Sequence, residues 1–280
     1  MSEQNKFSVL MSVYKKENPI YLKAAIDSVI NQTLMPSDIV VVCDGSLTDE
    51  LEKVLDFYKS IYPELFNIVG YEKNQGLGFA LNYGLQKCKY DLVARMDTDD
   101  ISVKTRFELQ VAFMDTHKNI DVLGGQIVEF YEEEIIAKRE VPLNHTEIIK
   151  FIKGRNPFNH MTVMFRKSSV IKAGNYIDLH FLEDYYLWVR MLVYNCKFSN
   201  LDEILVYART GVDMYKRRGG YKYFKSWVTL ERYMLKNKLI SRLYYYFTLG
   251  FRFFLQVVLP DNLRGFIFKK IARKKVSNDG

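Results

Sequence analysis

Val93-Ala94-Arg95-Met96-Asp97-Thr98-Asp99-Asp100 is a strand-like run that ends in three carboxylates within four positions. Carboxylates this close repel one another and raise one another's pKa unless a positive charge lies among them. On residue chemistry alone, the cluster is either a solvated turn at the end of a strand or a cation site. The segments around it decide between these interpretations.

Apolar runs alternate with helical patterns in the ninety residues before this cluster. The runs cover residues 7–13, 39–43 and 66–71 and are rich in β-forming residues. Between them, the sequence predicts a helix opening at Asn18-Pro19, a second capped by Thr48 and a third over residues 76–88. Continuous apolar strands that alternate with amphipathic helices are typical of a parallel sheet covered on both faces. The predicted fold class is therefore α/β.

The carboxyl edge of such a sheet is where ligands bind. That edge brings Tyr14 and Asp44 close to the acidic cluster 97–100, although the three segments are far apart in sequence. A hard divalent cation, Mg²⁺ or Mn²⁺, takes one or two carboxylates and completes its shell with water and phosphate oxygens. Taken alone, Asp44 also fits a turn closed by its own side chain, and Tyr14 also fits an exposed aromatic residue at the rim.

The pattern is less regular after residue 100. It predicts a strand over 121–130 interrupted by a glycine pair, an exposed acidic turn at 132–134, and a strand at 161–165. A helix starting near residue 181 carries Glu183 and Asp184 in its first turn. There the two acids offset the helix dipole, or one of them is a general base for a hydroxyl nucleophile.

Several other site types lack support in the sequence. The chain contains no phosphate-binding P-loop, no nucleophile-elbow serine motif and no dinucleotide-binding glycine motif. The four histidines have no metal-ligand spacing, and His160 by itself fits a loop histidine that donates to a carbonyl. P-loop, hydrolase and nicotinamide-cofactor functions are therefore disfavoured.

Six segments, in this order, carry a family resemblance. They are residues 7–14, 28–33, 42–46, 74–82, 95–100, and the pair Glu183-Asp184 with Trp188 and Arg190. Together they resemble the family 2 glycosyltransferases of the GT-A fold, of the type that builds bacterial surface polysaccharides. The resemblance spans residues 7 to about 192.

The resemblance implies a Rossmann-like GT-A fold, with a mixed, mainly parallel sheet flanked by helices. Residues 1–213 would form the catalytic domain. Its nucleotide-binding half would cover about residues 1–100, and its acceptor half about 101–213. Residues 214–280 would form a helical, basic and aromatic extension.

The resemblance also implies roles for the residues that match the family motifs. Ser12, Val13 and Tyr14 would hold the nucleotide, with Tyr14 against the base and Asp44 at uracil or ribose. Asp97 would contact ribose and, with Asp99, hold the divalent metal on the donor diphosphate, and Asp100 is an alternative ligand.

The chemistry implied is an inverting sugar transfer from a UDP-linked nucleotide-sugar donor to a saccharide acceptor that is itself lipid-linked. Asp184 would be the general base, with Glu183 beside it, and His160 would lie beside the donor site. Capsule, exopolysaccharide and O-antigen synthesis are the matching processes. The alternatives are a metal-dependent nucleotidyltransferase and a non-catalytic binding protein on the same fold.

The positive charge is concentrated at the C-terminal end. The formal net charge is +7, yet residues 216–280 hold 16 Lys and Arg against three acids, a balance of +13, so the first 215 residues sum to −6. The aromatic and basic pattern of residues 216–275 predicts association with an anionic membrane surface. A helical subdomain packed on the catalytic domain is the other interpretation. No segment resembles a base-reading module, so a nucleic-acid partner is not expected.

The cysteines and the N-terminal residues bear on location. Three cysteines without a C-x-x-C pair predict reduced thiols, and the first six residues lack a signal-peptide pattern. The apolar run over 243–259 contains a cation and is shorter than the roughly 20 apolar residues of a membrane span. We therefore expect a cytoplasmic protein, peripheral on the inner face of the cell membrane.

Overall fold

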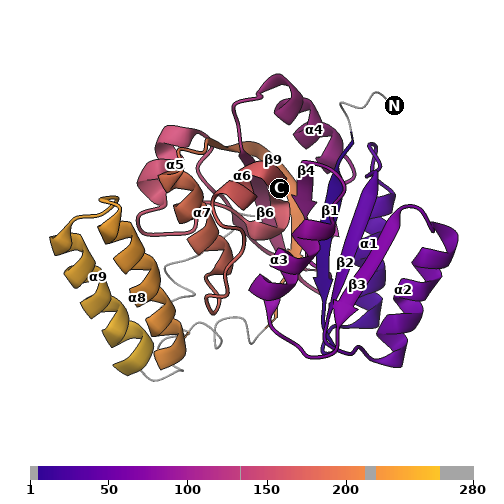
Figure 1. Cartoon of the computed structure of the whole chain (residues 1–280), viewed down its shortest axis with the longest axis horizontal. Coiled ribbons are helices and arrows are strands. Elements are labelled where there is room, and N and C mark those ends of the chain that lie inside the picture. The colour runs from indigo at the N-terminus through magenta and orange to yellow at the C-terminus, as the bar shows by residue number, and fades with distance from the viewer. Residues whose placement is uncertain (1–5, 133, 212–218, 259–280) are drawn as a thin grey trace.

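A nine-stranded mixed sheet runs through the middle of the protein (Figure 1). The computed structural model describes residues 6–132, 134–211 and 219–258. The strands lie in the order β3-β2-β1-β4-β8-β6-β9-β5, and β7 pairs with β6. Their bounds are β1 Ser8–Val13, β2 Asp38–Asp44, β3 Phe66–Tyr71, β4 Leu92–Arg95, β5 Ile101–Ser102, β6 Val122–Tyr131, β7 Glu134–Arg139, β8 Met164–Arg166 and β9 Phe198–Arg209.

Helices cover both faces of this sheet. They are α1 Pro19–Ile30, α2 Asp49–Ile61, α3 Leu77–Lys87, α4 Arg106–Thr116, α5 His145–Phe151, α6 Lys167–Lys172, α7 Glu183–Val193, α8 Tyr221–Lys236 and α9 Arg242–Phe253, with the short turns η2 His160–Thr162 and η3 Phe254–Val258. The expected caps are present, since Asn18 accepts from the amide of Ile20 and Thr48 from that of Leu51.

The parallel half of the sheet is as the sequence predicts. Strands β3, β2, β1 and β4 pair in parallel, and β6 pairs in parallel with β9. Strands β8, β7 and β5 run antiparallel to their neighbours. Side chains alternate along β1, so Val9 and Met11 pack with α1, α2 and α4, while Leu10 packs with α3 and α7. The mixed, mainly parallel α/β fold is confirmed.

Two local predictions in the second half need correction. The predicted strand at 161–165 starts only at Met164, because η2 occupies His160–Thr162. The Thr162 hydroxyl donates to the carbonyl oxygen of Asn159 and accepts from the amide of Gly125, which holds this turn. The glycine pair does not interrupt β6. It lies beside a shift in register against β9, and a Cβ on Gly124 would lie 2.3 Å from the side-chain oxygen of Asn200.

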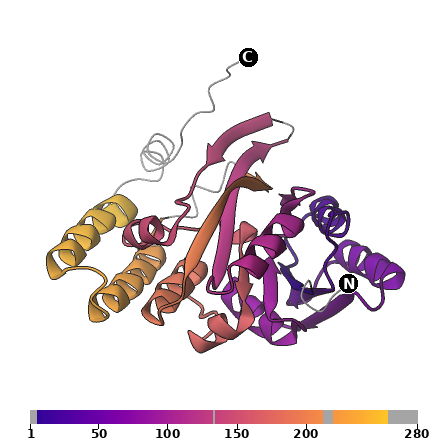
Figure 2. The same cartoon turned by 90° about the horizontal axis from the view of Figure 1, so that it is seen from above.

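The last two described helices form a pair at one end of the molecule. Helix α8 packs on α7, with Trp227 against Tyr185 and Tyr233 against Tyr186, and α9 lies outside α8 (Figures 1 and 2). The expected helical character of the tail is therefore confirmed as far as Val258. Residues 259–280, including the predicted interfacial segment 265–275, lie outside the described residues. Within the described ranges, no helix has both the length and the apolar content that crossing a bilayer requires.

Candidate active site

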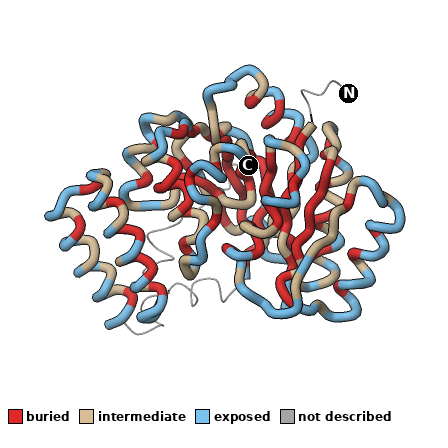
Figure 3. The backbone as a smooth tube through the Cα atoms, in the orientation of Figure 1, coloured by how far each residue is buried: buried red, intermediate tan, exposed pale blue. Residues whose placement is uncertain are grey.

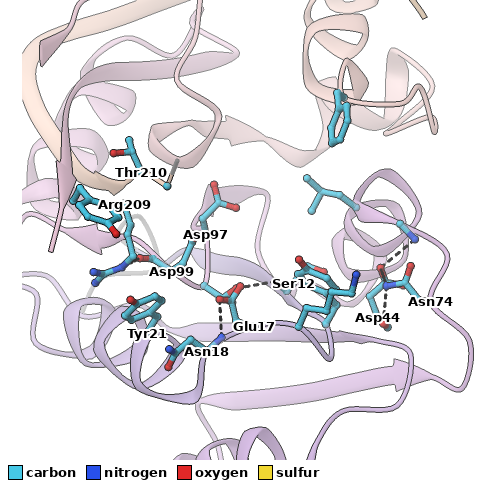
Figure 4. Close-up of a pocket in the computed structure, with 18 of the residues that line it drawn as sticks. Ser12, Glu17, Asn18, Tyr21, Asp44, Asn74, Asp97, Asp99, Arg209 and Thr210 are labelled. Carbon is cyan, nitrogen blue, oxygen red and sulfur yellow. Dashed lines mark hydrogen bonds between the residues drawn. The ribbon is translucent and has the colours of Figure 1, made fainter. Parts of the chain in front are cut away.

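A cavity of about 780 Å³ opens at the carboxyl edge of the parallel strands. Figure 4 shows Asp44 and Asn74 at one end of it, Arg209 and Tyr21 at the other, and Asp97 between. The ends of β1 and β2 and the loops after β1, β3 and β4 supply most of the lining residues, and β9 with the β6–β7 turn supplies the far wall. This volume lies within the range of small-molecule sites.

The acidic loop after β4 faces this cavity with two of its three carboxylates. Asp97 and Asp99 line the cavity, whereas Asp100 is buried and its Oδ1 accepts from the backbone amide of Arg209 at 2.7 Å. Burial, together with the nearby charges of Asp97 and Glu17, raises the pKa of Asp99 to about 7. Burial also raises the pKa of Asp100 well above its usual range. The loop therefore concentrates negative charge that a cation would neutralise.

Behind the loop lies a buried arginine that the sequence analysis did not single out. Arg95 is 1% exposed, and its guanidinium forms an ion pair with Asp97. Arg106, also buried, donates to the backbone carbonyl of Arg95 at 2.7 Å. The positive charge of Arg95 neutralises part of the negative charge of the acidic loop. Because the guanidinium pairs with Asp97, it neutralises the charge of the Asp99 carboxylate less.

Arg209 fixes the same loop from the opposite side. Its guanidinium lies 3.8 Å from the ring centre of Tyr21 and 4.6 Å from that of Phe130, and its Nε donates to the Asp99 carbonyl. Thr98 donates to the Glu17 carboxylate at 2.9 Å and ties the loop to the start of α1. These contacts set the position of Asp99 before any ligand binds.

Asp44 holds the loop that precedes α3. Its carboxylate accepts from the Tyr71 hydroxyl, the Asn74 amide and the backbone amides of Gln75 and Gly76, at 2.7–3.1 Å. These donors lie 27–32 residues further along the chain, so the carboxylate ties two loops together rather than closing a turn of its own. Asp44 lines the cavity but is 4% exposed, so it also shapes the cavity through Asn74 and Gly76.

Of the β1 residues singled out, Ser12 and Tyr14 line the cavity, and Tyr14 is 37% exposed. Val13 is fully buried and packs in the core beneath them.

The predicted base lies at the start of α7, beside the cavity. Phe181 lines the cavity wall, and Glu183 and Asp184 follow it, both half-buried and neither among the cavity-lining residues of the described chain. Asp184 accepts at Oδ2 from Asn156 at 2.6 Å and at Oδ1 from its neighbour's amide. Burial, together with the nearby charge of Asp184, raises the pKa of Glu183 to about 7.

His160 begins the turn η2 and contacts Tyr176. Its Nε2 lies 3.0 Å from the Tyr176 hydroxyl. Burial and the charge of Arg95 lower the pKa of His160 to about 4, against the opposing charges of Asp184 and Asp97. The ring is therefore neutral at physiological pH.

Trp188 and Arg190 lie in the core, away from the cavity. Trp188 is fully buried against Phe158, and Arg190 donates to the carbonyls of Ala173 and Asn175.

The acidic loop suits a cation held jointly with a ligand. Within residues 6–132, 134–211 and 219–258, no three His, Cys, Asp or Glu side chains are grouped to enclose a metal. Mg²⁺ and Mn²⁺ bound to a nucleotide do not need such a cage, because one or two carboxylates, phosphate oxygens and waters complete the shell. Asp97 and Asp99, both facing the cavity, fit that role.

A polar cavity at the carboxyl edge of a mainly parallel sheet, with an acidic loop on its floor, is typical of nucleotide-binding α/β folds, and the GT-A glycosyltransferases are one such class. Comparison with known proteins gives the family directly. The model of glycosyl transferase family 2 matches residues 8–174. This chain belongs to that family and is a glycosyltransferase.

Relatives in bacteria are similar over most of their length. An uncharacterized glycosyltransferase of Haemophilus influenzae is 44% identical over 96% of this chain and 100% of its own. The amylovoran biosynthesis glycosyltransferase AmsE of Erwinia amylovora is 42% identical over 83% of this chain and 86% of its own. A UDP-Gal:alpha-D-GlcNAc-diphosphoundecaprenol beta-1,3-galactosyltransferase of Escherichia coli is 36% identical, over 96% and 97%.

Solved structures agree on the fold. Staphylococcus aureus TarS (residues 1–349) superposes with a TM-score of 0.67 at 20% identity, covering 94% of this chain and 78% of its own. The mannosyltransferase PcManGT of Pyrobaculum calidifontis, solved with GDP-Man and Mn²⁺, has a TM-score of 0.61 at 12% identity, covering 82% and 64%.

Proposed function

We propose that this chain is an inverting glycosyltransferase that moves a sugar from a UDP-linked donor to a lipid-linked saccharide during synthesis of a bacterial surface polysaccharide. One arrangement carries the proposal. The cavity joins a nucleotide-sized rim at Tyr14 and Asp44 to the acidic loop, and Asp184 lies beside its far wall. The E. coli relative, whose name specifies UDP-Gal and a diphosphoundecaprenol acceptor, supports this choice of substrates.

The donor would lie along the floor of the cavity. Its base would stack on the exposed ring of Tyr14, and its ribose would meet Asp97 and the loop that Asp44 holds. Asp99, with Asp97, would hold a divalent cation on the diphosphate, and that cation would stabilise the charge that develops on the leaving group. Asp100 supports the loop through Arg209 rather than facing the cavity.

Asp184 would accept the proton of the acceptor hydroxyl. Its two hydrogen bonds come from donors, so the carboxylate is held as an acceptor with lone pairs to spare. A hydroxyl becomes a competent nucleophile when a carboxylate takes its proton. Displacement from the face opposite the diphosphate inverts the anomeric carbon, which turns an α-linked donor into a β-linked product.

The acceptor half would include the far wall of the cavity, formed by Tyr131, Glu132 and Phe181. A lipid-linked acceptor is reached at a membrane surface, so we place the enzyme at the cytoplasmic face of the cell membrane. The +13 balance of residues 216–280 supports this location.

Release of the nucleotide distinguishes the proposal from its alternatives. Purified protein, Mn²⁺ and a panel of sugar nucleotides are incubated with a GlcNAc-diphosphate lipid, and the products are separated. A glycosyltransferase of this kind releases UDP from one sugar nucleotide of the panel and adds that sugar to the lipid. Release of pyrophosphate would indicate a nucleotidyltransferase, and the absence of turnover with every donor would indicate a binding protein.

A further inference from the structure

Helix α9 directs the polar groups of Thr248 and Arg252 toward the protein and several large apolar side chains toward solvent. Thr248 and Arg252 both donate to Glu231 of α8, and Tyr244 donates to the carbonyl of Lys153. A helix on the surface of a soluble protein normally has the opposite arrangement. Such a reversal indicates that another apolar phase covers the outer face.

The outer side of α9, continued by the first residue of η3, carries a broad group of large side chains. They lie about one helical turn apart, at residues 243, 246–247, 251 and 253–254, and are 44–82% exposed. They are Leu243, Tyr246, Phe247, Phe251, Phe253 and Phe254. We call this set the α9 aromatic face. Figure 3 shows the outward side of the helix pair as exposed, in contrast to the buried strands.

Contacts on the inner side fix the rotation of the helix. The Arg252 guanidinium lies 3.2 Å from the ring centre of Trp227 and pairs with the buried carboxylate of Glu231 at 2.9 Å. Tyr245 packs into the main core. Rotating α9 to hide its aromatic face would break this pair and leave a buried Glu231 without its cation, which is costly.

The charges around the α9 aromatic face favour one kind of partner. Between residues 219 and 258 the chain has seven Lys and Arg and one acid, Glu231. Glu231 is 1% exposed and paired with Arg252, so this region has no exposed carboxylate. The other six cations are all exposed: Lys222, Lys225, Arg232, Lys236, Lys238 and Arg242. An apolar face on a helix pair whose exposed charges are all cations complements a layer with an apolar interior and anionic headgroups.

We propose that the α9 aromatic face lies in the headgroup region of an anionic bilayer, with α9 parallel to the membrane plane. The inference deepens the membrane location in the proposed function by naming the surface that makes the contact. It differs from binding through the basic segment 265–275, because apolar side chains provide much of the affinity. Such binding persists in part at high salt, whereas purely electrostatic binding does not.

The test measures binding of the full chain to vesicles without donor or acceptor, so its outcome is independent of the glycosyltransferase activity. Vesicles of phosphatidylcholine, alone or with one-third phosphatidylglycerol, are sedimented with wild-type protein and with the double variant Phe247→Ser, Phe254→Ser. We expect the double variant to lose about tenfold or more in partition coefficient. Phe57→Ser, at a 52% exposed phenylalanine on α2, is the matched control and binds like wild type.

A second pair of variants isolates the charges. Lys238→Gln with Arg242→Gln should weaken binding to anionic vesicles by about fivefold per charge at low salt and leave binding to neutral vesicles unchanged. Lys53→Gln on α2 is the control.

Three results would overturn the proposal. The first is that wild type binds neither kind of vesicle. The second is that the double phenylalanine variant binds as tightly as wild type, which would locate binding elsewhere in the chain. The third is that this variant loses thermal stability or dissociates a dimer in sedimentation velocity, which would show that protein already covers the α9 aromatic face.

Discussion

Asn156 donates a hydrogen bond to Asp184, from Nδ2 to Oδ2 at 2.6 Å. The orientation of the amide is fixed because its Oδ1 accepts from the backbone amide of Phe158. Asn156 lies in the loop before η2, and Asp184 in the first turn of α7. The two segments that meet here are 28 residues apart in sequence, and their contact aims the proposed base.

Replacing Asn156 should change the pH dependence of transfer. Asn156→Asp places a like charge beside the base, so the acidic limb of kcat/KM should move to higher pH by about one unit or more. Asn156→Ala only removes a donor and should give a smaller shift in the same direction. Profiles of kcat/KM from pH 5 to 9 measure both. If both variants lose stability while the acidic limb stays in place, Asn156 has only a structural role.

Glu183 should make stability depend on pH. Its carboxyl pKa is raised by burial from 4.5 to about 7, so the folded state binds the proton more tightly than the unfolded chain. The resulting stabilisation is complete below about pH 4.5 and is lost as the pH rises through 7. The free energy of unfolding of Glu183→Gln should therefore rise relative to that of wild type by on the order of 1–3 kcal/mol between pH 5 and pH 8. Urea unfolding at both pH values tests this. If the two proteins differ in unfolding free energy by the same amount at pH 5 and pH 8, the pKa of Glu183 is not raised by folding.

Arg209 should control the affinity for the divalent cation. Lysine keeps the charge but loses both the flat stacking on Tyr21 and the Nε hydrogen bond to the Asp99 carbonyl. Arg209→Lys should raise the Mn²⁺ concentration for half-maximal activity about tenfold. Metal-free binding of uridine should not change. Arg155→Lys, at an exposed arginine, is the control, and an equal effect in both variants would exclude a specific role.

Two glycines on the nucleotide side should respond differently to alanine. Both have a left-handed backbone, with φ +85° at Gly45 and +90° at Gly76. A Cβ on Gly45 would lie 2.7 Å from the backbone nitrogen of Asn74, whereas nothing lies within 4 Å of a Cβ on Gly76.

Gly45→Ala should therefore cost about 1–3 kcal/mol more stability than Gly76→Ala. It should also weaken UDP binding, since the Asn74 loop must move. Thermal unfolding and calorimetry with UDP measure the two effects. Equal losses in both variants would show that backbone strain alone matters.

The first hundred residues could be predicted well from the sequence because each element has its own local signal. Apolar runs mark the strands, Asn18 and Thr48 cap their helices, and parallel pairing then places Asp97 at the same edge of the sheet as Asp44. The family motifs identified Asp184 as the base, but its role remains a prediction.

The second half of the site depends on contacts that no local pattern reveals. Arg209 ends a strand with no motif of its own, and its stacking on Tyr21 joins segments nearly two hundred residues apart. Phe181, which lines the cavity, has a left-handed backbone at φ 61°, a conformation that its residue type does not predict. The burial of Arg95 beneath Asp97 likewise follows from tertiary packing. The sequence did offer one signal for this ion pair, because Arg95 and Asp97 lie two residues apart at the end of the same strand.

The central claim is single-displacement transfer with Asp184 as the base. Its most direct test is the anomeric configuration of the product formed by wild type, measured by NMR, together with the rate of Asp184→Asn on the same donor and acceptor. The account predicts a β-linked product from an α-linked donor and a loss of at least about a hundredfold in kcat for Asp184→Asn, with donor binding preserved. An α-linked product, or near-normal transfer by Asp184→Asn, would contradict it.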